Sequence, residues 1–190
     1  MVIDTHTDTD WAADKATRKS VACVNHEFDG CPISSTVSQQ SFLALSSAEA
    51  ELGGVLTGAT QGIGYKRLLE WLGFSVEWRL GTDSSAARAI CLREGVGKIR
   101  HMDLKLLWCQ QAVKSHNLKI YKVAGPLNRA NIGTKKLAVT QFEEERALIK
   151  MIPVEYVEAQ SVPVVHAVSS DALTLRHLVQ GMRQLIEEMA

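Results

Sequence analysis

The amino-acid sequence predicts a mixed α/β fold, in which helices flank a single sheet. Three observations lead to this prediction. Short β-branched segments alternate with longer segments of helical periodicity. The first strands lie close enough in the sequence to form a hairpin meander. The 190 residues, 46% of them hydrophobic and 22% charged, are enough to bury one full core.

Three strands are expected at the start of the chain. They cover residues 1–7, residues 19–25 (KSVACVN) and residues 32–38 (PISSTVS). Asp29-Gly30 lies between the second and the third, and this pair is typical of a tight hairpin turn.

A long helix is expected next, beginning at Ser46-Ser47 and running to about Leu72. Ser47 and Glu51 have nearly the spacing of a capping box, and Gly73 is a typical residue beyond a helix end. The order then continues with a strand, two helices and a last strand. These four elements are expected at residues 74–82, 84–92, 101–116 and 118–123, which makes five strands in all.

The composition changes after Leu137. Residues 141–150 (QFEEERALIK) predict an acidic helix, and Pro153 and Pro163 bracket an irregular connection. Residues 169–171 (SSD) are expected to cap a last amphipathic helix whose apolar stripe docks on the domain. We therefore divide the chain into a sheet domain at residues 1–137 and a partly helical C-terminal extension at residues 138–190.

Charge is distributed unevenly although the net charge is zero. Residues 88–136 carry eleven bases and two acids, which indicates a face that meets a polyanion. No apolar run approaches membrane-spanning length and no signal peptide is visible, so we expect an intracellular protein, with cytoplasm and nucleus not distinguished. The four cysteines form no CxxC pair, which predicts reduced thiols and no zinc site.

Residues 57–64 (TGATQGIG) resemble the cofactor fingerprint of short-chain dehydrogenases, which suggests an NADP-dependent oxidoreductase as one interpretation. The context argues against it, because the preceding residues predict a helix where that fingerprint requires a strand. The Tyr-x-x-x-Lys pair of that family is also missing after Tyr65, Tyr121 and Tyr156. The alternative interpretation is a glycine-rich helix that packs closely on a sheet.

Three acids form a more informative set. Asp8 and Asp83 are expected at the ends of two strands, and Glu51 near the start of the long helix. Such positions converge at one edge of an α/β sheet, where three carboxylates with waters and a substrate phosphate suit Mg²⁺. Asp83 is also expected to share a helix N-cap with Ser84.

Six sequence blocks occur in order around these acids: DTDWAADKATRKSVACV, ALSSAEAELGG, KRLLEWLGF, GTDSSAARAI, GKIRHMDLKLLWCQQAV and NRANIGTKKL. Together they resemble the ribonuclease H domain of Copia-type LTR retrotransposon Pol polyproteins, over residues 1–137. The resemblance implies a ribonuclease H-like fold and metal-dependent endonucleolytic cleavage of the RNA strand of RNA·DNA hybrids. It implies two Mg²⁺ ions as cofactors, with Mn²⁺ as a substitute. It also places TGATQGIG inside the first long helix of the family.

The resemblance assigns the catalytic and metal-binding roles to Asp8, Glu51 and Asp83. Asn131 stands where the family has a fourth catalytic Asp, so the site carries three negative charges instead of four. The first acid after Asp103 is Glu143, and we expect nothing nearby to replace the missing one. We therefore expect the second metal ion to bind more weakly. The nuclease activity would then be reduced, or would need Mn²⁺ or a high Mg²⁺ concentration. The alternative is a catalytically inactive, nucleic-acid-binding remnant of the same fold.

Two other acids of these motifs are expected to lie off the site: Asp10 in solvent at a strand end, and Glu49 on another side of the helix. Phosphate contacts with the hybrid are expected from four basic residues: Arg100, His101, Lys105 and Lys135. No membrane and no protein partner is implied. The reverse transcriptase that would precede this domain is absent from the sequence, which suggests a fragment or a separately expressed copy.

Overall fold

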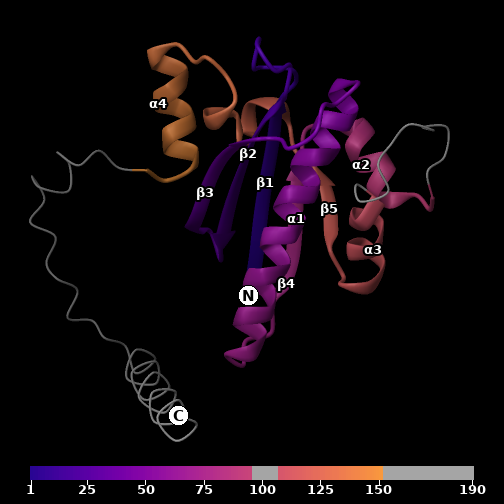
Figure 1. Cartoon of the computed structure of the whole chain (residues 1–190). Coiled ribbons are helices and arrows are strands. Elements are labelled where there is room, and N and C mark those ends of the chain that lie inside the picture. The colour runs from indigo at the N-terminus through magenta and orange to yellow at the C-terminus, as the bar shows by residue number, and fades with distance from the viewer. Residues whose placement is uncertain (96–106, 152–190) are drawn as a thin grey trace, which may run out of the picture. The chain divides into compact units, whose positions relative to one another are not determined.

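A five-stranded sheet in the order β3-β2-β1-β4-β5 forms the centre of the domain (Figure 1). The computed structural model describes residues 1–95 and 107–151. The predictions for residues 96–106 and 152–190, among them the last amphipathic helix, lie outside this range. Within it the predicted fold class is confirmed. The strands are β1 (Val2–Asp10), β2 (Val21–Phe28), β3 (Cys31–Gln39), β4 (Glu77–Thr82) and β5 (Lys119–Lys122).

The sheet is mixed because its two halves are connected differently. β1, β2 and β3 form an antiparallel meander, and Asp29 and Gly30 turn the second hairpin with φ of 45° and 78°. β4 pairs parallel to β1, and β5 pairs parallel to β4. Each of these two strands follows a helical crossover. β1 extends three residues beyond its predicted end, since it pairs with β2 as far as Asp10↔Val21.

Four α-helices accompany the sheet in the described residues: α1 (Ser47–Trp71), α2 (Ser85–Leu92), α3 (Trp108–Ser115) and α4 (Val139–Leu148). α1 packs on β1, while α2 contacts both β5 and α3. The buried core lies between the sheet and the helices α1, α2 and α3, and Leu52, Val55, Trp78 and Leu80 are almost fully buried in it. In the described parts of the chain, no helix has the length and apolarity needed to cross a membrane.

The caps of α1 and α2 differ from those predicted. Ser46, not Ser47, caps α1 by accepting a hydrogen bond from the Glu49 backbone N–H at 3.2 Å. Ser84 alone caps α2 through the Ala87 N–H. The predicted caps are therefore wrong, because Ser46 and not Ser47 has the capping geometry at α1, and Ser84 caps α2 without Asp83. The carboxylates of Glu51 and Asp83 are thereby left free for other contacts.

The glycines of TGATQGIG lie inside α1, so this segment forms no phosphate-binding turn after a strand, and the oxidoreductase interpretation loses its only support. They instead allow a close approach to the sheet. A Cβ on Gly58 would lie 2.7 Å from Thr7 Cγ2, and one on Gly62 would lie 2.5 Å from Trp78 Nε1. The alternative interpretation, a glycine-rich helix packed closely on a sheet, agrees with this structure.

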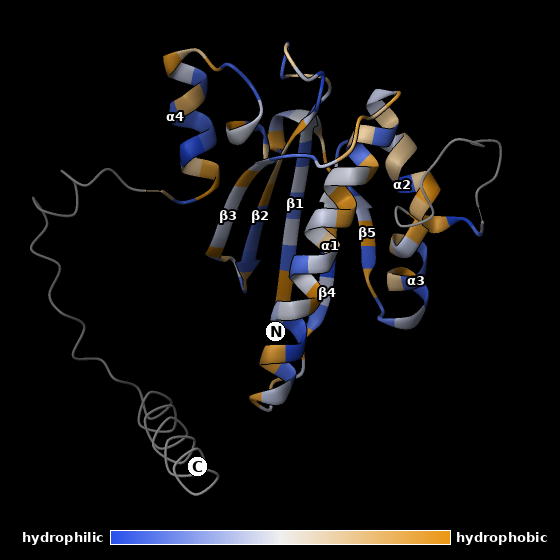
Figure 2. Ribbon diagram, viewed as in Figure 1, coloured by the Kyte–Doolittle hydropathy of each residue, from blue (hydrophilic) through white to orange (hydrophobic). Residues whose placement is uncertain are grey.

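α4 belongs to the first compact unit, which spans Met1–Met151. It contacts the short 3₁₀ helix η3 (Asn131–Gly133), and the Lys150 ammonium donates to the Gly30 carbonyl in the β2–β3 turn. Its middle is hydrophilic and its two ends are more hydrophobic (Figure 2). The predicted division of the chain at residues 137/138 stays a prediction.

The packing of α1 makes a testable prediction about two of its glycines. Gly58→Ala should destabilise the protein by roughly 1–3 kcal/mol, since the new methyl group would overlap the Thr7 side chain. Gly64→Ala should stabilise it by up to about 1 kcal/mol, because Gly64 is exposed with nothing within 4 Å of a Cβ. Urea unfolding of both variants measures the two effects. Equal effects at both positions would contradict the close approach of α1 to the sheet.

Candidate metal centre

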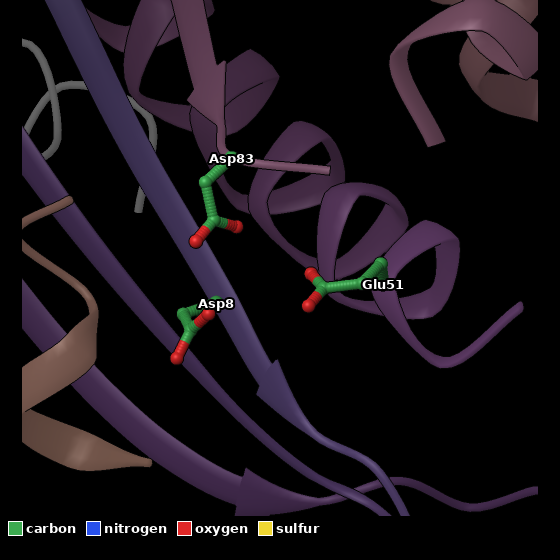
Figure 3. Close-up of side chains that lie close together, drawn as sticks. All are labelled: Asp8, Glu51 and Asp83. Atoms are coloured by element: carbon green, nitrogen blue, oxygen red, sulfur yellow. The ribbon is translucent and has the colours of Figure 1, made fainter. Parts of the chain in front are cut away.

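Three carboxylates from separate elements converge at one edge of the sheet (Figure 3). Asp8 lies on β1, Glu51 on α1, and Asp83 directly after β4. One carboxylate oxygen from each of these residues lies within 4.8 Å of the others. The structure thus brings together the three acids that the sequence analysis selected.

The register of the strands explains this convergence. β1 and β4 run parallel with Thr7 opposite Thr82, so Asp8 and Asp83 follow paired residues at the same end of two neighbouring strands. Glu51 reaches them from the N-terminal part of α1, which the small residues along that helix hold close to β1. Backbone pairing thus places two of the carboxylates, and helix packing places the third.

The electrostatics of the cluster are unfavourable without a cation. Burial, followed by the charges of Asp8 and Asp83, raises the pKa of Glu51 to about 8. Burial and the charge of Asp8 also raise the pKa of Asp83. Glu51 Oε2 is buried and has no hydrogen-bond partner among the described residues. A hard divalent cation with oxygen ligands fits these residues, because it would neutralise the repulsion and satisfy the buried oxygen.

Two neighbouring residues also contact Asp8. The Thr134 hydroxyl donates to Asp8 Oδ2, and Lys135 Nζ lies 3.7 Å from the same oxygen. Lys135 also donates to Asn131 Oδ1. Its ammonium therefore lies at the carboxylate cluster, and its expected contact with a phosphate stays a prediction. Arg100, His101 and Lys105 lie outside the described residues.

Asn131 is 3% exposed and is placed beside the cluster by two asparagines. The buried Asn128 donates through Nδ2 to the Thr7 carbonyl on β1 at 2.9 Å. Asn25 Nδ2 on β2 donates to the Arg129 carbonyl at 2.5 Å. These two bonds attach the segment before η3 to the central strands, so the residue in the position of the fourth acid lies near Asp8.

One residue of this neighbourhood was missed by the sequence analysis. Asn131 Nδ2 donates to Glu145 Oε1 on α4 at 3.1 Å, so an acid does contact Asn131. Glu145 is not part of the cluster of three carboxylates, and the expectation that no nearby acid replaces the missing one stays a prediction. Three consecutive glutamates, Glu143 to Glu145, are typical of a solvated helix face, and Glu145 is buried only because α4 packs against η3. No signal in the sequence distinguishes it from its two neighbours.

The two acids expected to lie off the site also have defined surroundings. Asp10 is exposed at the end of β1. Glu49 accepts a hydrogen bond from the Leu45 backbone N–H at 2.8 Å, at the start of α1. Neither belongs to the cluster of three carboxylates among the described residues.

The raised pKa of Glu51 predicts how stability depends on pH. Without divalent cations, the folded protein keeps the Glu51 proton up to about pH 8, whereas the unfolded chain loses it near pH 4.5. Stability should therefore fall as pH rises from about 4.5 to 8. Glu51→Gln should remove part of this fall and stabilise the protein by roughly 2–4 kcal/mol at pH 8.

Urea unfolding at pH 5 and pH 8, in a chelating buffer, measures the effect. Asp10→Asn is the matched control, because it removes an exposed acid near the same site. Adding Mg²⁺ should stabilise the wild type and not Glu51→Gln. A wild type that is as stable at pH 8 as at pH 5 in the chelating buffer would contradict the strained cluster.

Comparison with known proteins finds one similar sequence among curated proteins and similar folds among solved structures. The sequence is 29% identical over 152 residues to the retrovirus-related Pol polyprotein from transposon TNT 1-94 of Nicotiana tabacum. That match covers 79% of this chain, and the chain spans 11% of the length of the curated relative. No family model matches the chain.

Among solved structures, RNase H1 from Halobacterium salinarum is similar, with a TM-score of 0.51 and 11% identity, over 68% of this chain and 91% of that one. The N-terminal RNase H domain of a Mycobacterium tuberculosis protein, fused to maltose binding protein, has a TM-score of 0.49 and 16% identity, over 77% and 96% of the two chains. The sequence is thus similar to part of a retrotransposon Pol polyprotein, and the fold is similar to that of RNase H1.

Proposed function

We propose that this domain is a metal-dependent ribonuclease H that cleaves the RNA strand of RNA·DNA hybrids, derived from a Copia-type element. The convergence of Asp8, Glu51 and Asp83 on a ribonuclease H-like sheet carries the proposal. The sequence relationship to a retrotransposon Pol polyprotein supports it, because copying RNA into DNA produces such hybrids.

Each carboxylate has a defined part in holding the cations. Asp8 is 3% exposed and lies on the central strand, whereas Glu51 and Asp83 are half-buried. Glu51 and Asp83 complete a set of oxygen ligands that suits Mg²⁺ or Mn²⁺. Two such ions, when bound, supply the charge that stabilises the attacking and the leaving oxygens of a phosphodiester.

Asn131 modifies this site. It retains a carbonyl oxygen but lacks the charge of a carboxylate, and Lys135 adds a positive charge near Asp8 and Asn131. Both features oppose the binding of a second cation. We therefore expect weak Mg²⁺ binding, and higher activity with Mn²⁺ or with Mg²⁺ at high concentration.

We expect the domain to recognise the RNA·DNA hybrid by its duplex shape and by its sugar-phosphate backbone. Proteins that bind A-like duplexes contact 2′-hydroxyls and phosphates across the shallow minor groove, with little sequence readout. The predicted phosphate contacts, from Arg100, His101, Lys105 and Lys135, are spread over the basic third of the chain. Such contacts would make affinity decrease as salt rises.

One observation favours a second candidate function, a hybrid-binding module without catalytic activity. The Lys135 ammonium already contacts Asp8 and Asn131, so it offsets part of the carboxylate charge without any bound cation. A domain of this kind would still bind the hybrid through its basic residues, and it would not cleave it.

A cleavage assay separates the two candidates. A hybrid with a labelled RNA strand is incubated with the full chain in Mg²⁺ and, separately, in Mn²⁺. The wild type should cleave the RNA and be more active in Mn²⁺. Asp83→Asn should lower the rate by at least about a hundredfold, because it removes both a charge and a ligand oxygen.

Asp10→Asn is the control, since it changes an exposed acid outside the cluster. Binding of the hybrid is measured in parallel by fluorescence anisotropy without divalent cations. Hybrid binding without cleavage, in either metal, would favour the non-catalytic module. A folded protein that neither binds nor cleaves the hybrid would exclude both candidates.

A further inference from the structure

The side chain of Asn131 lies between two hydrogen-bond acceptors, the Gly125 carbonyl and the Glu145 carboxylate, and one hydrogen-bond donor, the Lys135 ammonium. Its amide nitrogen donates to the Gly125 carbonyl at 2.7 Å and to Glu145 Oε1 at 3.1 Å. Its carbonyl oxygen accepts from the Lys135 ammonium, which lies 3.7 Å from Asp8 Oδ2. All the polar atoms of this amide are therefore partnered, and its oxygen shares the Lys135 ammonium with Asp8.

This environment determines which way the amide points. If the group were rotated by 180°, its oxygen would face the Gly125 carbonyl and the Glu145 carboxylate, and no proton would lie between them. The amide nitrogen would then face the Lys135 ammonium, which has no acceptor. Each rotated contact is repulsive, so Glu145 and Gly125 together favour the orientation that presents oxygen to Asp8 and Lys135.

A carboxylate at position 131 would not suit these surroundings. One of its oxygens would lie against the Gly125 carbonyl and the Glu145 carboxylate, where Asn131 now donates two hydrogen bonds. Two carboxylates in such contact repel each other at a buried position. Asn131 and Glu145 are therefore a matched pair, in which the amide donates to the acid and a second carboxylate would be repelled.

Glu145 is itself held at this position. It is 8% exposed, and its second oxygen, Oε2, is buried without a hydrogen-bond partner among the described residues. A buried carboxylate with one unsatisfied oxygen is costly, so the burial of Glu145 against Asn131 points to a role beyond solubility. Its neighbour Glu144 is exposed, and Glu144, Glu145 and Asn131 line one surface pocket.

We propose that Glu145 is a positioning residue, which orients the Asn131 amide so that its carbonyl oxygen replaces the missing carboxylate oxygen at the cation site. This inference rests on the proposed function, since it concerns the cations that Asp8, Glu51 and Asp83 would hold. Glu145 lies on α4, which follows the last of the six sequence blocks. The inference therefore gives α4 a role in positioning a cation ligand.

The test is a double-mutant cycle of the full chain with four proteins: wild type, Glu145→Gln, Asn131→Asp and the double variant. Mn²⁺ binding is measured by electron paramagnetic resonance. In the wild-type background, Glu145→Gln should weaken Mn²⁺ binding by about tenfold, because the neutral amide is a weaker acceptor than the carboxylate and holds the ligand less firmly. In the Asn131→Asp background, the same change should strengthen binding, because it removes the repulsion between two carboxylates.

Glu144→Gln is the matched control, because it makes the same change of charge one residue away. It should alter Mn²⁺ binding by less than about twofold in either background. A purely structural role of Glu145 in docking α4 would give an effect of the same sign in both backgrounds. That result, or equal effects of Glu144→Gln and Glu145→Gln, would overturn the proposal.

Two further readouts require no metal. Asn131→Asp should lower the Tm by about 5 °C, and adding Glu145→Gln should recover most of this loss. The side-chain NH₂ signals of Asn131, identified by their absence from the Asn131→Asp spectrum, should shift in Glu145→Gln and not in Glu144→Gln. Unchanged Asn131 NH₂ signals in Glu145→Gln would contradict a direct hydrogen bond from the Asn131 amide to Glu145.

Failure of this inference is distinguishable from failure of the proposed function. If the wild type binds Mn²⁺ and cleaves the hybrid while Glu145→Gln behaves like Glu144→Gln, only the positioning role is overturned. If the cycle behaves as expected and no hybrid is cleaved, the positioning role stands and the nuclease does not. A wild type that binds no Mn²⁺ would overturn both.

Discussion

Repulsion among three carboxylates held at one edge of the sheet is the constraint on which the site depends. Asp8, Glu51 and Asp83 present oxygens within 4.8 Å of one another, and the pKa of Glu51 is raised because burial and two like charges disfavour its ionised form. Such a cluster lowers the stability of the fold, as the residues of functional sites commonly do. The rest of the structure can be understood as what holds these groups in place against that repulsion.

The sheet and α1 provide that rigidity. The parallel pairing of β1 with β4 aligns Asp8 with Asp83, and the small residues of α1 let this helix lie close enough for Glu51 to reach them. Glycines weaken an isolated helix, so the close packing of α1 on β1 must compensate for their cost. Residues 57–64, which resemble a nucleotide-binding fingerprint, therefore serve to pack α1 closely on the sheet. This packing brings Glu51 near Asp8.

The segment from Asn128 to Lys135 gives this site its particular character. Hydrogen bonds to Thr7 and from Asn25 attach it to the central strands, and Lys135 and Thr134 then contact Asp8. In this chain the fourth position holds an amide, flanked by a lysine on one side and a buried glutamate on the other. Both neighbours are ionisable, so the local charge depends on packing as well as on the residue at position 131.

Local chemistry allowed the sequence by itself to predict much of this protein: the order of strands and helices, the Asp29-Gly30 turn, and the convergence of Asp8, Glu51 and Asp83. These features follow from periodicity, turn residues and strand ends, which nearby residues determine. The caps of α1 and α2 were misassigned by one residue, because adjacent serines and acids compete for the same backbone N–H groups. Only the tertiary structure decided that Glu145 lies against Asn131, fourteen residues away, since the contact depends on how α4 packs and not on any local pattern.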